Sequence, residues 1–442
     1  MFEIREKPEM VERAMLVSIY FDPSEAGEKQ AMLDELEDLV SNLGIGIAGK
    51  HLIKSRDMHA KFLCGTGKAQ EVKQLALDCR ADCVVFDNML SPSQQREWER
   101  LIDECVIDRE EVILDIFARR ARTREATLQV ELARMQYSLP RMARMWNHLD
   151  RQGGGSGGGK GGGGAARGEG EKQIEVDRRL ARARIEAIQR ELVLVTRQRA
   201  TQRKERERQA VATAAIVGYT NAGKSSLLSL VSGSEVMARD MLFATLDTTT
   251  RKIELPHGQP LLLTDTVGFI RNLPHRLVEA FKSTLEEAVL ADFLIQVVDA
   301  SDPEAVRHYE TTLEVLGELG AGDKPMIVVL NKVDLVPEER RGALETLLAP
   351  HFSGRVVTMS VKEGNGAGDL LNACVEMLES RVRRARFLIP YTRSDLVAAM
   401  HSEGKVFSTE YVEEGTLLEA VLPVAFYNKL GSFLTDRQPP CS

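Results

Sequence analysis

Apolar and polar positions in the first 115 residues follow two alternating patterns. The short apolar runs Met15–Phe21 and Cys83–Asp87 predict buried strands. Between them, the apolar spacing around Glu28–Leu43 and Lys68–Cys79 predicts helices. Strands that alternate with helices are typical of an α/β fold with a mainly parallel sheet. We therefore expect an N-terminal α/β domain over residues 1–115.

A heptad pattern follows this domain. Its apolar positions are Leu128, Leu132, Met135, Leu139, Met142, Trp146 and Leu149. Pro140 lies inside the pattern and should kink or restart the helix. A second apolar seam consists of Ile185, Ile188, Leu192 and Val195. Two such helices can bury each other's seams, which predicts an antiparallel helical hairpin over residues 116–208. We assign no chemistry to its Met and Trp residues.

The segment that joins the two seams, residues 153–170, is mostly glycine, with Lys160 and Arg167 among the exceptions. Glycine runs have high chain entropy and cannot pack, so we expect a tip loop that is disordered in the free protein. It is either an inert linker or a loop that threads a narrow anionic space. An earlier glycine-containing sequence, Gly65–Lys68, lacks phosphate-loop spacing, and we interpret it as a helix-start turn.

The strongest motif begins after the strand-like run Ala214–Val217. It reads G-x-x-x-x-G-K-S and is followed by the helical pattern Ser226–Val231, which is the context that a phosphate-binding P-loop requires. Lys224 is predicted to neutralise β- and γ-phosphate oxygens, and Ser225 to bind Mg²⁺. The predicted nucleotide-binding residues here are Gly218, Tyr219, Thr220, Asn221, Ala222, Gly223, Lys224 and Ser225.

A second motif ends the apolar run Leu261–Leu263 with D-x-x-G. The predicted nucleotide-binding residues are Asp265, Thr266, Val267 and Gly268. Asp265 can hold Mg²⁺ through water, and the Gly268 amide can sense the γ-phosphate. We therefore group Gly268 with the catalytic residues.

A third motif follows the apolar run Met326–Leu330 and selects the base. The Asp334 carboxylate can accept two hydrogen bonds from guanine, and adenine lacks both donors. Asn331 is expected to brace the loop, and Lys332 to pack its stem along the base. A loop after the strand-like run at 356–359 can contact guanine O6. The predicted base-binding residues are Asn331, Lys332, Val333, Asp334, Ser360, Val361 and Lys362. Together the motifs predict GTP rather than ATP.

Residues 242–250 are predicted to form a mobile loop that supplies a Thr to Mg²⁺. We favour Thr245, with Thr249 second, because Thr245 stands in an F-x-T-L segment like those of related GTPases. The predicted nucleotide-binding residues of this loop are Phe243, Ala244, Thr245, Leu246 and Asp247. Catalysis is thus assigned to Lys224, Thr245 and Gly268, and Mg²⁺ ligation to Ser225 and Thr245.

The residue after Gly268 is Phe269, where many small GTPases carry a Gln that orients the attacking water. Phenylalanine cannot polarise water, so we expect slow intrinsic hydrolysis that a partner stimulates. Phe269 can also pack against the core, and both interpretations can hold.

The GTP-binding domain is expected over residues 209–382 and a small α/β domain over 385–442. The latter should contain a strand at Phe387–Pro390, a helix at Ser394–His401 and a hairpin turning at Glu413–Gly415. A terminal amphipathic helix with Phe426, Leu430 and Phe433 should follow. The C-terminal domain shows no catalytic constellation.

Composition narrows the class of protein. The chain has 442 residues, 43 % of them hydrophobic, and no apolar run approaches the roughly 18–20 residues of a membrane span. The N-terminus carries Glu3, Glu6 and Glu9 rather than the basic start of a signal peptide. Six scattered Cys without a C-x-x-C pair indicate a reduced, cytoplasmic protein rather than a disulfide or zinc scaffold.

Charge is segregated along the chain. Residues 116–208 contain 22 Lys and Arg against 11 Asp and Glu, a local excess of 11 positive charges in a chain of net charge -8. This excess is either a solvated helical face with i,i+4 pairs or a binding surface for a polyanion. The predominance of Arg favours phosphate contacts.

Beyond the nucleotide motifs, several long blocks resemble the HflX family of translational GTPases, within the Obg–HflX group. The blocks are residues 84–96, 113–118, 120–126, 129–133, 175–179, 265–270 and 272–275. The resemblance spans nearly the whole chain. It implies an N-terminal α/β domain, a helical hairpin, a G domain and a short C-terminal domain. It also implies binding to the large (50S) ribosomal subunit and its rRNA, dissociation or rescue of stalled ribosomes, and ribosome-stimulated GTP hydrolysis.

The glycine tip departs from the family pattern, which reads roughly G-G-x-G-x-R-G-P-G-E. The loop is longer here, and Glu169 stands where Pro is expected. Proline would stiffen the tip, whereas glutamate adds repulsion from rRNA phosphate. The departure concerns how the tip engages the ribosome and leaves the GTP site unaffected.

Two other functions compete with a ribosome-binding GTPase. A GTPase coupled to tRNA modification could use a reactive Cys near the C-terminus, but the sequence around Cys441 lacks the expected flanking motif. A membrane or protein-signalling GTPase could place its basic helices on anionic lipid, although the seams favour a self-packed hairpin. We expect a monomer without stable membrane insertion, with Mg²⁺ as cofactor and GTP or GDP as ligand.

Overall fold

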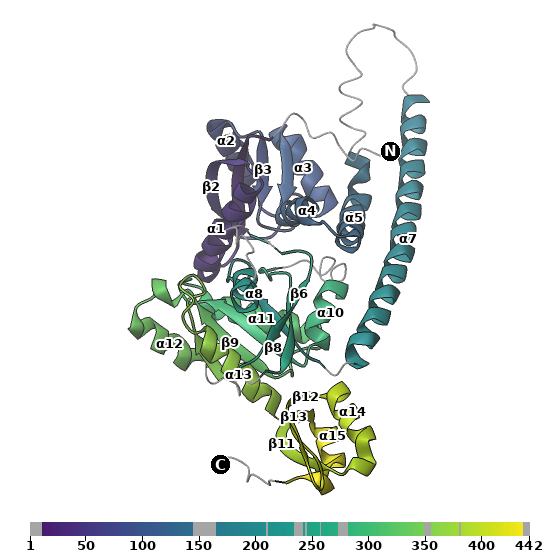
Figure 1. Cartoon of the computed structure of the whole chain (residues 1–442). Coiled ribbons are helices and arrows are strands. Elements are labelled where there is room, and N and C mark those ends of the chain that lie inside the picture. The colour runs from purple at the N-terminus through teal and green to yellow at the C-terminus, as the bar shows by residue number, and fades with distance from the viewer. Residues whose placement is uncertain are drawn as a thin grey trace. The chain divides into compact units, whose positions relative to one another are not determined.

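The structure is a computed structural model that describes residues 11–144, 165–208, 211–233, 242–243, 245–256, 258–272, 282–348, 355–379 and 382–435 (Figure 1). The chain forms two compact units. The first contains the described residues up to Leu194 and also Phe243, Leu246 and Asn272. The second contains most of the remaining residues, including the P-loop and the C-terminal region.

A four-stranded parallel sheet forms the centre of the first unit. Its strands are β1 (Arg13–Tyr20), β2 (Gly46–Lys54), β3 (Cys83–Phe86) and β4 (Cys105–Asp108), in the order β2-β1-β3-β4. All neighbouring pairs run parallel. The predicted α/β class and both predicted strands are therefore confirmed.

Helices cover this sheet. They are η1 (Pro23–Glu25), α1 (Ala26–Asn42), α2 (Thr66–Cys79), α3 (Pro92–Ile102), α4 (Arg109–Arg120) and α5 (Arg124–Ser138). The Ser91 side chain caps α3, because it accepts a hydrogen bond from the Gln94 amide while the Gln94 side chain accepts from the Ser91 amide. Gly65 is the N-cap of α2, which confirms the helix-start turn. Helix α4 spans the predicted boundary between residues 115 and 116.

The predicted hairpin is built from α5, a 3-10 turn η2 (Leu139–Arg144) and α7 (Ala165–Arg208). Pro140 lies in η2, directly after α5 ends, so the predicted interruption is confirmed. Two ion pairs join the helices, Arg124 to Glu191 at 2.5 Å and Arg184 to Glu131 at 2.6 Å. Their register shows that α5 and this part of α7 run antiparallel.

The described seam residues are buried in α5 and partly buried in α7. Leu128, Leu132 and Met135 are buried in α5, and Ile188 is 1 % exposed in α7. The predicted tip loop needs a correction, because α7 already begins at Ala165 rather than after residue 170. Two alanines and the charged residues that follow favour helix, so the long helix extends through Gly168 and Gly170. Residues 153–164 of the predicted tip lie outside the described residues.

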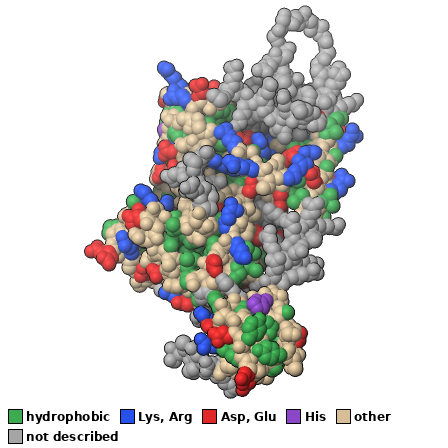
Figure 2. Space-filling model, in the orientation of Figure 1, with side chains coloured by type: hydrophobic (Ala, Val, Ile, Leu, Met, Phe, Trp, Pro, Cys, Tyr) green, Lys and Arg blue, Asp and Glu red, His purple; other side chains and the backbone are tan. Residues whose placement is uncertain are grey.

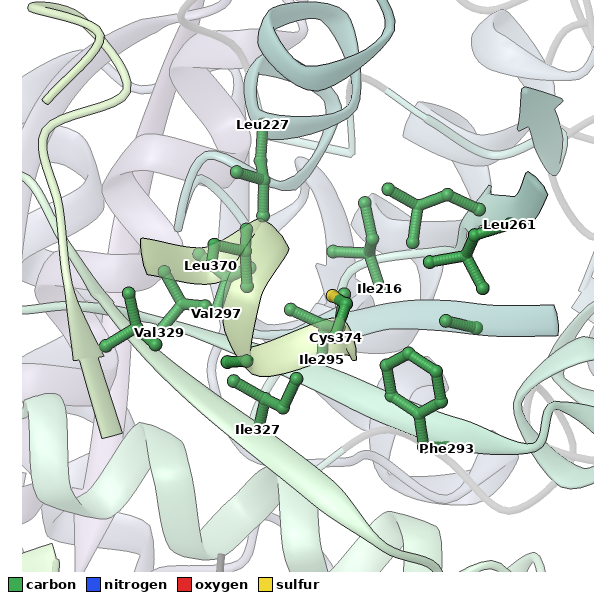
Figure 3. Close-up of a cluster of buried hydrophobic side chains, with 14 of the residues drawn as sticks. Ile216, Leu227, Leu261, Phe293, Ile295, Val297, Ile327, Val329, Leu370 and Cys374 are labelled. Carbon is green, nitrogen blue, oxygen red and sulfur yellow. The ribbon is translucent and has the colours of Figure 1, made fainter. Parts of the chain in front are cut away.

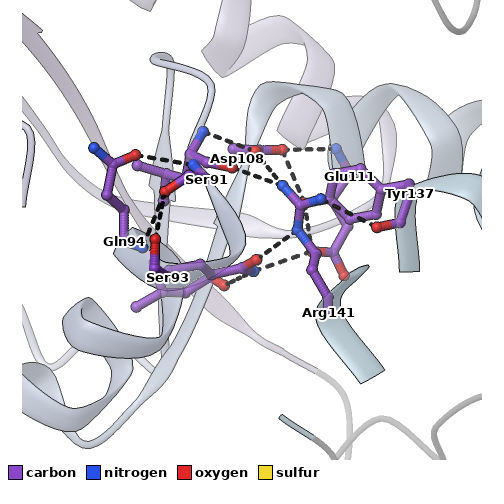
Figure 4. Close-up of polar contacts among 10 residues, drawn as sticks. Ser91, Ser93, Gln94, Asp108, Glu111, Tyr137 and Arg141 are labelled. Atoms are coloured by element: carbon purple, nitrogen blue, oxygen red, sulfur yellow. Dashed lines mark hydrogen bonds and ion pairs between the residues drawn. The ribbon is translucent and has the colours of Figure 1, made fainter. Parts of the chain in front are cut away.

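A buried polar network fixes the end of β4 (Figure 4). The fully buried Asp108 carboxylate accepts hydrogen bonds from the Leu90 and Glu111 amides and from the Tyr137 hydroxyl. The Arg141 guanidinium lies 3.6 Å from the same carboxylate and 3.7 Å from the Tyr137 ring centre. Burial raises the pKa of Asp108, whereas these donors and Arg141 oppose the rise. The network thus ties η2 to the sheet.

A six-stranded sheet forms the centre of the second unit. Its strands are β5 (Ala212–Gly218), β6 (Thr249–Glu254), β7 (Pro260–Asp265), β8 (Phe293–Asp299), β9 (Met326–Asn331) and β10 (Arg355–Thr358). The order is β10-β9-β8-β5-β7-β6, and only the edge strand β6 is antiparallel to its neighbour. The carboxyl ends of β5, β7 and β9 therefore lie at the same edge, which brings the three predicted nucleotide motifs together.

Helices of this unit pack on the sheet. They are α8 (Lys224–Ser232), α10 (Lys282–Leu290), α11 (Ala305–Glu318), η3 (Val333–Leu335), α12 (Glu338–Leu348) and α13 (Ala367–Glu379). The core joins side chains of α8 and α13, such as Leu227, Leu370 and Cys374, to strand residues such as Ile216 and Ile295 (Figure 3). Burial raises the pKa of the Cys374 thiol to about 12, so it behaves as an apolar core residue.

The C-terminal region forms a three-stranded antiparallel sheet with short helices. Its elements are β11 (Val382–Ile389), η5 (Tyr391–Arg393), α14 (Ser394–Glu403), β12 (Lys405–Val412), β13 (Gly415–Pro423), α15 (Val424–Lys429) and η6 (Gly431–Phe433). The predicted strand, helix and hairpin are confirmed. The terminal helix is shorter than predicted, because α15 ends at Lys429 and Phe433 belongs to η6.

Two further expectations concern the whole chain. Among the described residues, no helix is both long and apolar enough to cross a membrane. Five described cysteines, Cys64, Cys79, Cys83, Cys105 and Cys374, are free thiols. Cys441, on which the tRNA-modification alternative depends, lies outside the described residues.

Candidate functional site

The P-loop connects β5 to α8 with the geometry that its sequence predicts. Gly223 is the N-cap of α8 and has φ of 98°, a value that L side chains rarely adopt. A Cβ atom at Gly223 would lie 2.2 Å from the Asn331 amide nitrogen. Glycine is therefore required both by the backbone conformation and by the approach of the guanine-binding motif. The loop opens onto the N-terminus of α8, which favours an anion.

The side chain of Lys224 lies inside the P-loop. Its side chain is buried, and its Nζ donates a hydrogen bond to the Tyr219 carbonyl at 2.6 Å. Burial lowers the pKa of Lys224 to about 8, and the nearby Asp265 carboxylate opposes this shift. A phosphate at the helix N-terminus would favour the charged amine, so this lysine suits the predicted role of neutralising phosphate oxygens.

Two predicted Mg²⁺ contacts lie side by side. The Ser225 hydroxyl at the start of α8 donates to the Asp265 carboxylate at the end of β7, over 2.7 Å. Asp265 is 1 % exposed. A hydroxyl and a buried carboxylate are hard oxygen donors of the kind that Mg²⁺ takes, together with water and substrate phosphate. These residues therefore fit the ion.

The D-x-x-G segment runs against the P-loop. A Cβ atom at Gly268 would lie 2.9 Å from the Thr220 Cα and 3.0 Å from the Lys224 Nζ, so only glycine fits there. Thr266 turns away from the site and donates its hydroxyl to the Ile216 carbonyl at 2.7 Å. The predicted contact of Thr266 with nucleotide is therefore not made by its hydroxyl in this conformation.

Phe269 pairs with the P-loop through its backbone. Its carbonyl accepts from the Thr220 amide at 2.8 Å, and its amide donates to the Gly218 carbonyl at 3.1 Å. The side chain is 1 % exposed, which confirms that Phe269 packs in the core. An apolar buried ring has no group with which to orient water.

Asn331 braces the guanine end as predicted. Its amide nitrogen donates to the Ala222 carbonyl at 2.8 Å, and its amide oxygen accepts from the Val361 amide at 3.1 Å. One buried side chain thus links the P-loop to the loop that follows β10. In that loop, the Ser360 hydroxyl accepts from the Glu363 amide, and Ser360 is 1 % exposed.

The Asp334 side chain has a carboxylate oxygen that can accept a hydrogen bond from a ligand. Its Oδ1 atom is buried and has no hydrogen-bond partner among the described residues. A buried acceptor without a partner is costly, and the two N–H donors on the edge of guanine would satisfy it. This orphaned atom supports the predicted choice of base.

Lys332 has a partner that the sequence did not predict. Its Nζ lies 2.6 Å from an Asp299 carboxylate oxygen, at the end of β8. Its backbone has φ of 61°, which turns the chain directly after β9. Asp299 thus belongs to the structure of the site, although no motif marks it. The ion pair also gives the lysine stem a fixed direction, which is compatible with packing along a base.

The predicted switch loop is shorter than expected. Thr249 already begins β6, opposite Asp265 of β7, and the Thr250 hydroxyl lies 2.9 Å from the Thr264 hydroxyl across the strands. β-Branched residues favour this edge strand, which explains the correction. Thr245 and Asp247 lie before β6 and are half-buried, and Ala244 lies outside the described residues.

Phe243 is fixed within the first unit rather than in an open loop. Its ring meets the Phe117 ring edge-to-face with 4.7 Å between centroids, and Phe243 is 2 % exposed. The Leu242 carbonyl accepts a hydrogen bond from the side-chain amide of Asn42 at 3.5 Å. These contacts give Phe243 and Leu242 a packing role, whereas contact with nucleotide was predicted for Phe243.

Three family models match successive parts of the chain. The model for a GTP-binding GTPase N-terminal region matches residues 30–118, and that for a GTP-binding GTPase middle region matches residues 120–206. A model for a 50S ribosome-binding GTPase matches residues 213–332.

Known proteins resemble the chain along its length. It is 98 % identical over 437 residues to a GTPase HflX of Akkermansia muciniphila, with 99 % of the chain and 100 % of that protein covered. It is 41 % identical over 431 residues to a GTPase HflX of Lacrimispora saccharolytica, covering 97 % and 98 % respectively. The GTPase HflX of Escherichia coli is 39 % identical over 421 residues, with 95 % of each chain covered.

Proposed function

The chain belongs to the HflX family of GTPases and is a GTP-hydrolysing enzyme, and on this premise we propose that it binds the large ribosomal subunit when GTP is bound. The match of residues 213–332 to a family described as 50S ribosome-binding GTPases supports this partner. We further propose that it acts in dissociation or rescue of ribosomes, or in their biogenesis, as a monomer in the cytoplasm.

The basic hairpin supplies the surface for rRNA in this proposal. Arg179, Arg182 and Arg190 are exposed on α7, and Figure 2 shows basic side chains along the described part of this helix. Two ion pairs hold α7 to α5, and Ile188 of its apolar seam is buried, so this part of the helix is engaged within the protein. Arginine forks match phosphate oxygens and bind them in pairs. We therefore prefer rRNA to lipid as the polyanion.

The nucleotide site supplies the switch. Ser225 and Asp265 would hold Mg²⁺, with Thr245 as the proposed third residue, and the ion would neutralise charge on the β- and γ-phosphates. Lys224 would leave the Tyr219 carbonyl for the phosphates, and the Gly268 amide would contact the γ-phosphate. Loss of that phosphate frees Gly268 and the loop before β6, which is the usual origin of a GTP-dependent change.

In this proposal, rapid GTP hydrolysis requires a contribution from a partner outside the chain. Phe269 is buried in the core and offers no hydrogen-bonding group to a water molecule. We propose that the large subunit orders the switch segments or supplies the missing group. The single observation that carries this part of the proposal is the buried phenylalanine at the position that follows Gly268.

Multiple-turnover GTP hydrolysis with purified 50S, 30S and 70S particles tests the proposal. We expect slow hydrolysis by the protein alone and strong stimulation by particles that contain the large subunit, and none by 30S. Equal stimulation by 30S and 50S, or fast hydrolysis without ribosomes, would contradict it. Lys224→Ala, which should lose nucleotide binding, is the control for contaminating GTPases.

A further inference from the structure

The ring of Tyr219, the second residue of the P-loop, lies stacked on the imidazole of His308. The ring centres are 3.7 Å apart and the planes differ by 9°. Tyr219 is 6 % exposed, so its side of the stack is buried. His308 lies in the first turn of α11, and no nucleotide-binding motif includes it. The stack therefore connects the P-loop to α11, a helix that carries no nucleotide-binding motif.

The backbone around Tyr219 connects three parts of the site. Its carbonyl accepts the hydrogen bond from Lys224 Nζ. On either side, the Gly218 carbonyl and the Thr220 amide pair with the backbone of Phe269. A rotation of the Tyr219 peptide would therefore disturb the lysine contact and the pairing with the D-x-x-G segment together. Stacking of its side chain restricts that rotation.

His308 lies beside the loop between β8 and α11. Its Nδ1 lies 3.7 Å from a carboxylate oxygen of Asp302. The other Asp302 oxygen caps the loop by accepting from the Glu304 amide at 2.8 Å, and the Asp302 carbonyl accepts from Arg340 at 2.6 Å. At the start of the same loop, Asp299 pairs with Lys332 of the guanine motif. One loop thus reaches both the phosphate end and the base end.

We propose that His308 is a positioning residue for nucleotide binding, which acts by holding Tyr219 and hence the P-loop backbone in the conformation that receives phosphate. The proposal concerns the GTP site alone, so it stands or fails independently of ribosome binding. His308 contacts the P-loop through Tyr219 and takes no part in the chemical step.

The expected effect follows from which phosphates the P-loop holds. The loop surrounds phosphates that GTP and GDP share, so loss of the stack weakens the binding of both nucleotides. Aromatic pairs contribute about 2- to 10-fold in an equilibrium constant beyond the area they bury. Because His308 acts on nucleotide binding and takes no part in the chemical step, KM should rise by about this factor while kcat changes little.

Titration of the full-length protein with fluorescent GDP and with a fluorescent non-hydrolysable GTP analogue tests the proposal. His308→Ala should raise both Kd values by about 2- to 10-fold, and His308→Phe, which keeps a ring, should restore them to within about 2-fold of the wild type. His308→Ala combined with Tyr219→Ala should be no weaker than Tyr219→Ala alone. The matched control is His401→Ala, on the exposed surface of α14, which should bind like the wild type.

Three results would overturn the proposal. The first is unchanged affinity for both nucleotides in His308→Ala. The second is equal loss in the Ala and Phe variants, which would mean that stacking is not the cause. The third is a loss confined to the GTP analogue, which would point to the γ-phosphate contacts instead. Thermal unfolding without nucleotide is measured in parallel, and a fall in Tm with unchanged Kd values would reduce His308 to a packing residue.

Discussion

We predict that base selection depends on Asp334, a half-buried residue whose Oδ1 atom is buried and has no partner among the described residues. We predict that Asp334→Asn weakens GDP binding by roughly 10²- to 10⁴-fold, because two hydrogen bonds to a charged acceptor contribute about 1.5–3 kcal/mol each. Xanthine carries a carbonyl where guanine has its amine, so the Asn amide should improve binding of xanthosine diphosphate. Competition titration with both nucleotides measures the exchange.

The matched control for that change is Asp395→Asn, an exposed carboxylate in α14 that pairs with Arg393. It should leave both affinities unchanged. If Asp334→Asn loses GDP without gaining xanthosine diphosphate, Asp334 acts by supporting the loop rather than by reading the base.

Gly223 shows how backbone conformation limits the P-loop. We predict that Gly223→Ala abolishes measurable nucleotide binding, because the new methyl group would meet Asn331 at 2.2 Å in a backbone with φ of 98°. The strain of a non-glycine residue there costs about 1–3 kcal/mol of folding free energy in addition. Isothermal titration and thermal unfolding measure the two effects.

Gly317 in α11 provides the opposite control. A Cβ atom there meets nothing within 4 Å, and the residue is helical. Gly317→Ala should therefore stabilise the protein by about 0.5–1 kcal/mol and leave nucleotide binding unchanged. A Gly223→Ala protein that still binds GDP would mean that the loop can adopt another conformation.

At the scale of elements, the exposed arginines of α7 carry the proposed rRNA contact. We predict that Arg179→Gln with Arg182→Gln weakens 50S binding and makes its salt dependence shallower by about 1–2 units of log Kd against log salt. Neither side chain supports the seam, so the fold should persist. Sedimentation at several salt concentrations measures both quantities.

A control arginine that is also exposed lies on α3 of the first unit. Arg100→Gln on α3 removes a surface charge that pairs only with Glu97 among its described contacts. It should change neither the affinity nor the salt slope. An equal loss from Arg100→Gln would show that overall charge, and not the α7 surface, drives binding.

Much of the element pattern was predictable because short-range signals determine it. The P-loop, the guanine motif and the interruption at Pro140 follow from glycine, proline and apolar spacing in single segments. The extra strand β6 and the early start of α7 were missed. Edge pairing of Thr249 and Thr250 depends on β7, and Gly168 is helical because it lies within the long helix α7, although glycine itself disfavours helix.

Partners that lie far apart in sequence could not be predicted. Asp299 with Lys332 and Tyr219 with His308 meet only because β5, β8 and β9 are neighbours in the sheet. The same applies to Phe243, which a motif assigned to nucleotide but which packs on Phe117. Sequence motifs thus predict where the nucleotide binds, whereas contacts between distant segments, such as Asp299 with Lys332, were found only in the structure.

At the scale of the whole molecule, a charged hairpin and a nucleotide site occur in one chain. Residues 116–208 hold a positive excess while the remainder of the chain carries a net charge of -19. Such segregation directs a polyanion to one part of the protein and repels it from the rest. In this account, exchange of GTP for GDP needs to change only how residues 116–208 are exposed to the polyanion.

Sedimentation of the purified protein with 50S particles, in GDP and in a non-hydrolysable GTP analogue, tests this account most directly. The account predicts that clearly more protein pellets with 50S in the GTP-analogue state than with GDP, and that Lys224→Ala abolishes the difference. Equal pelleting in both nucleotide states would contradict it.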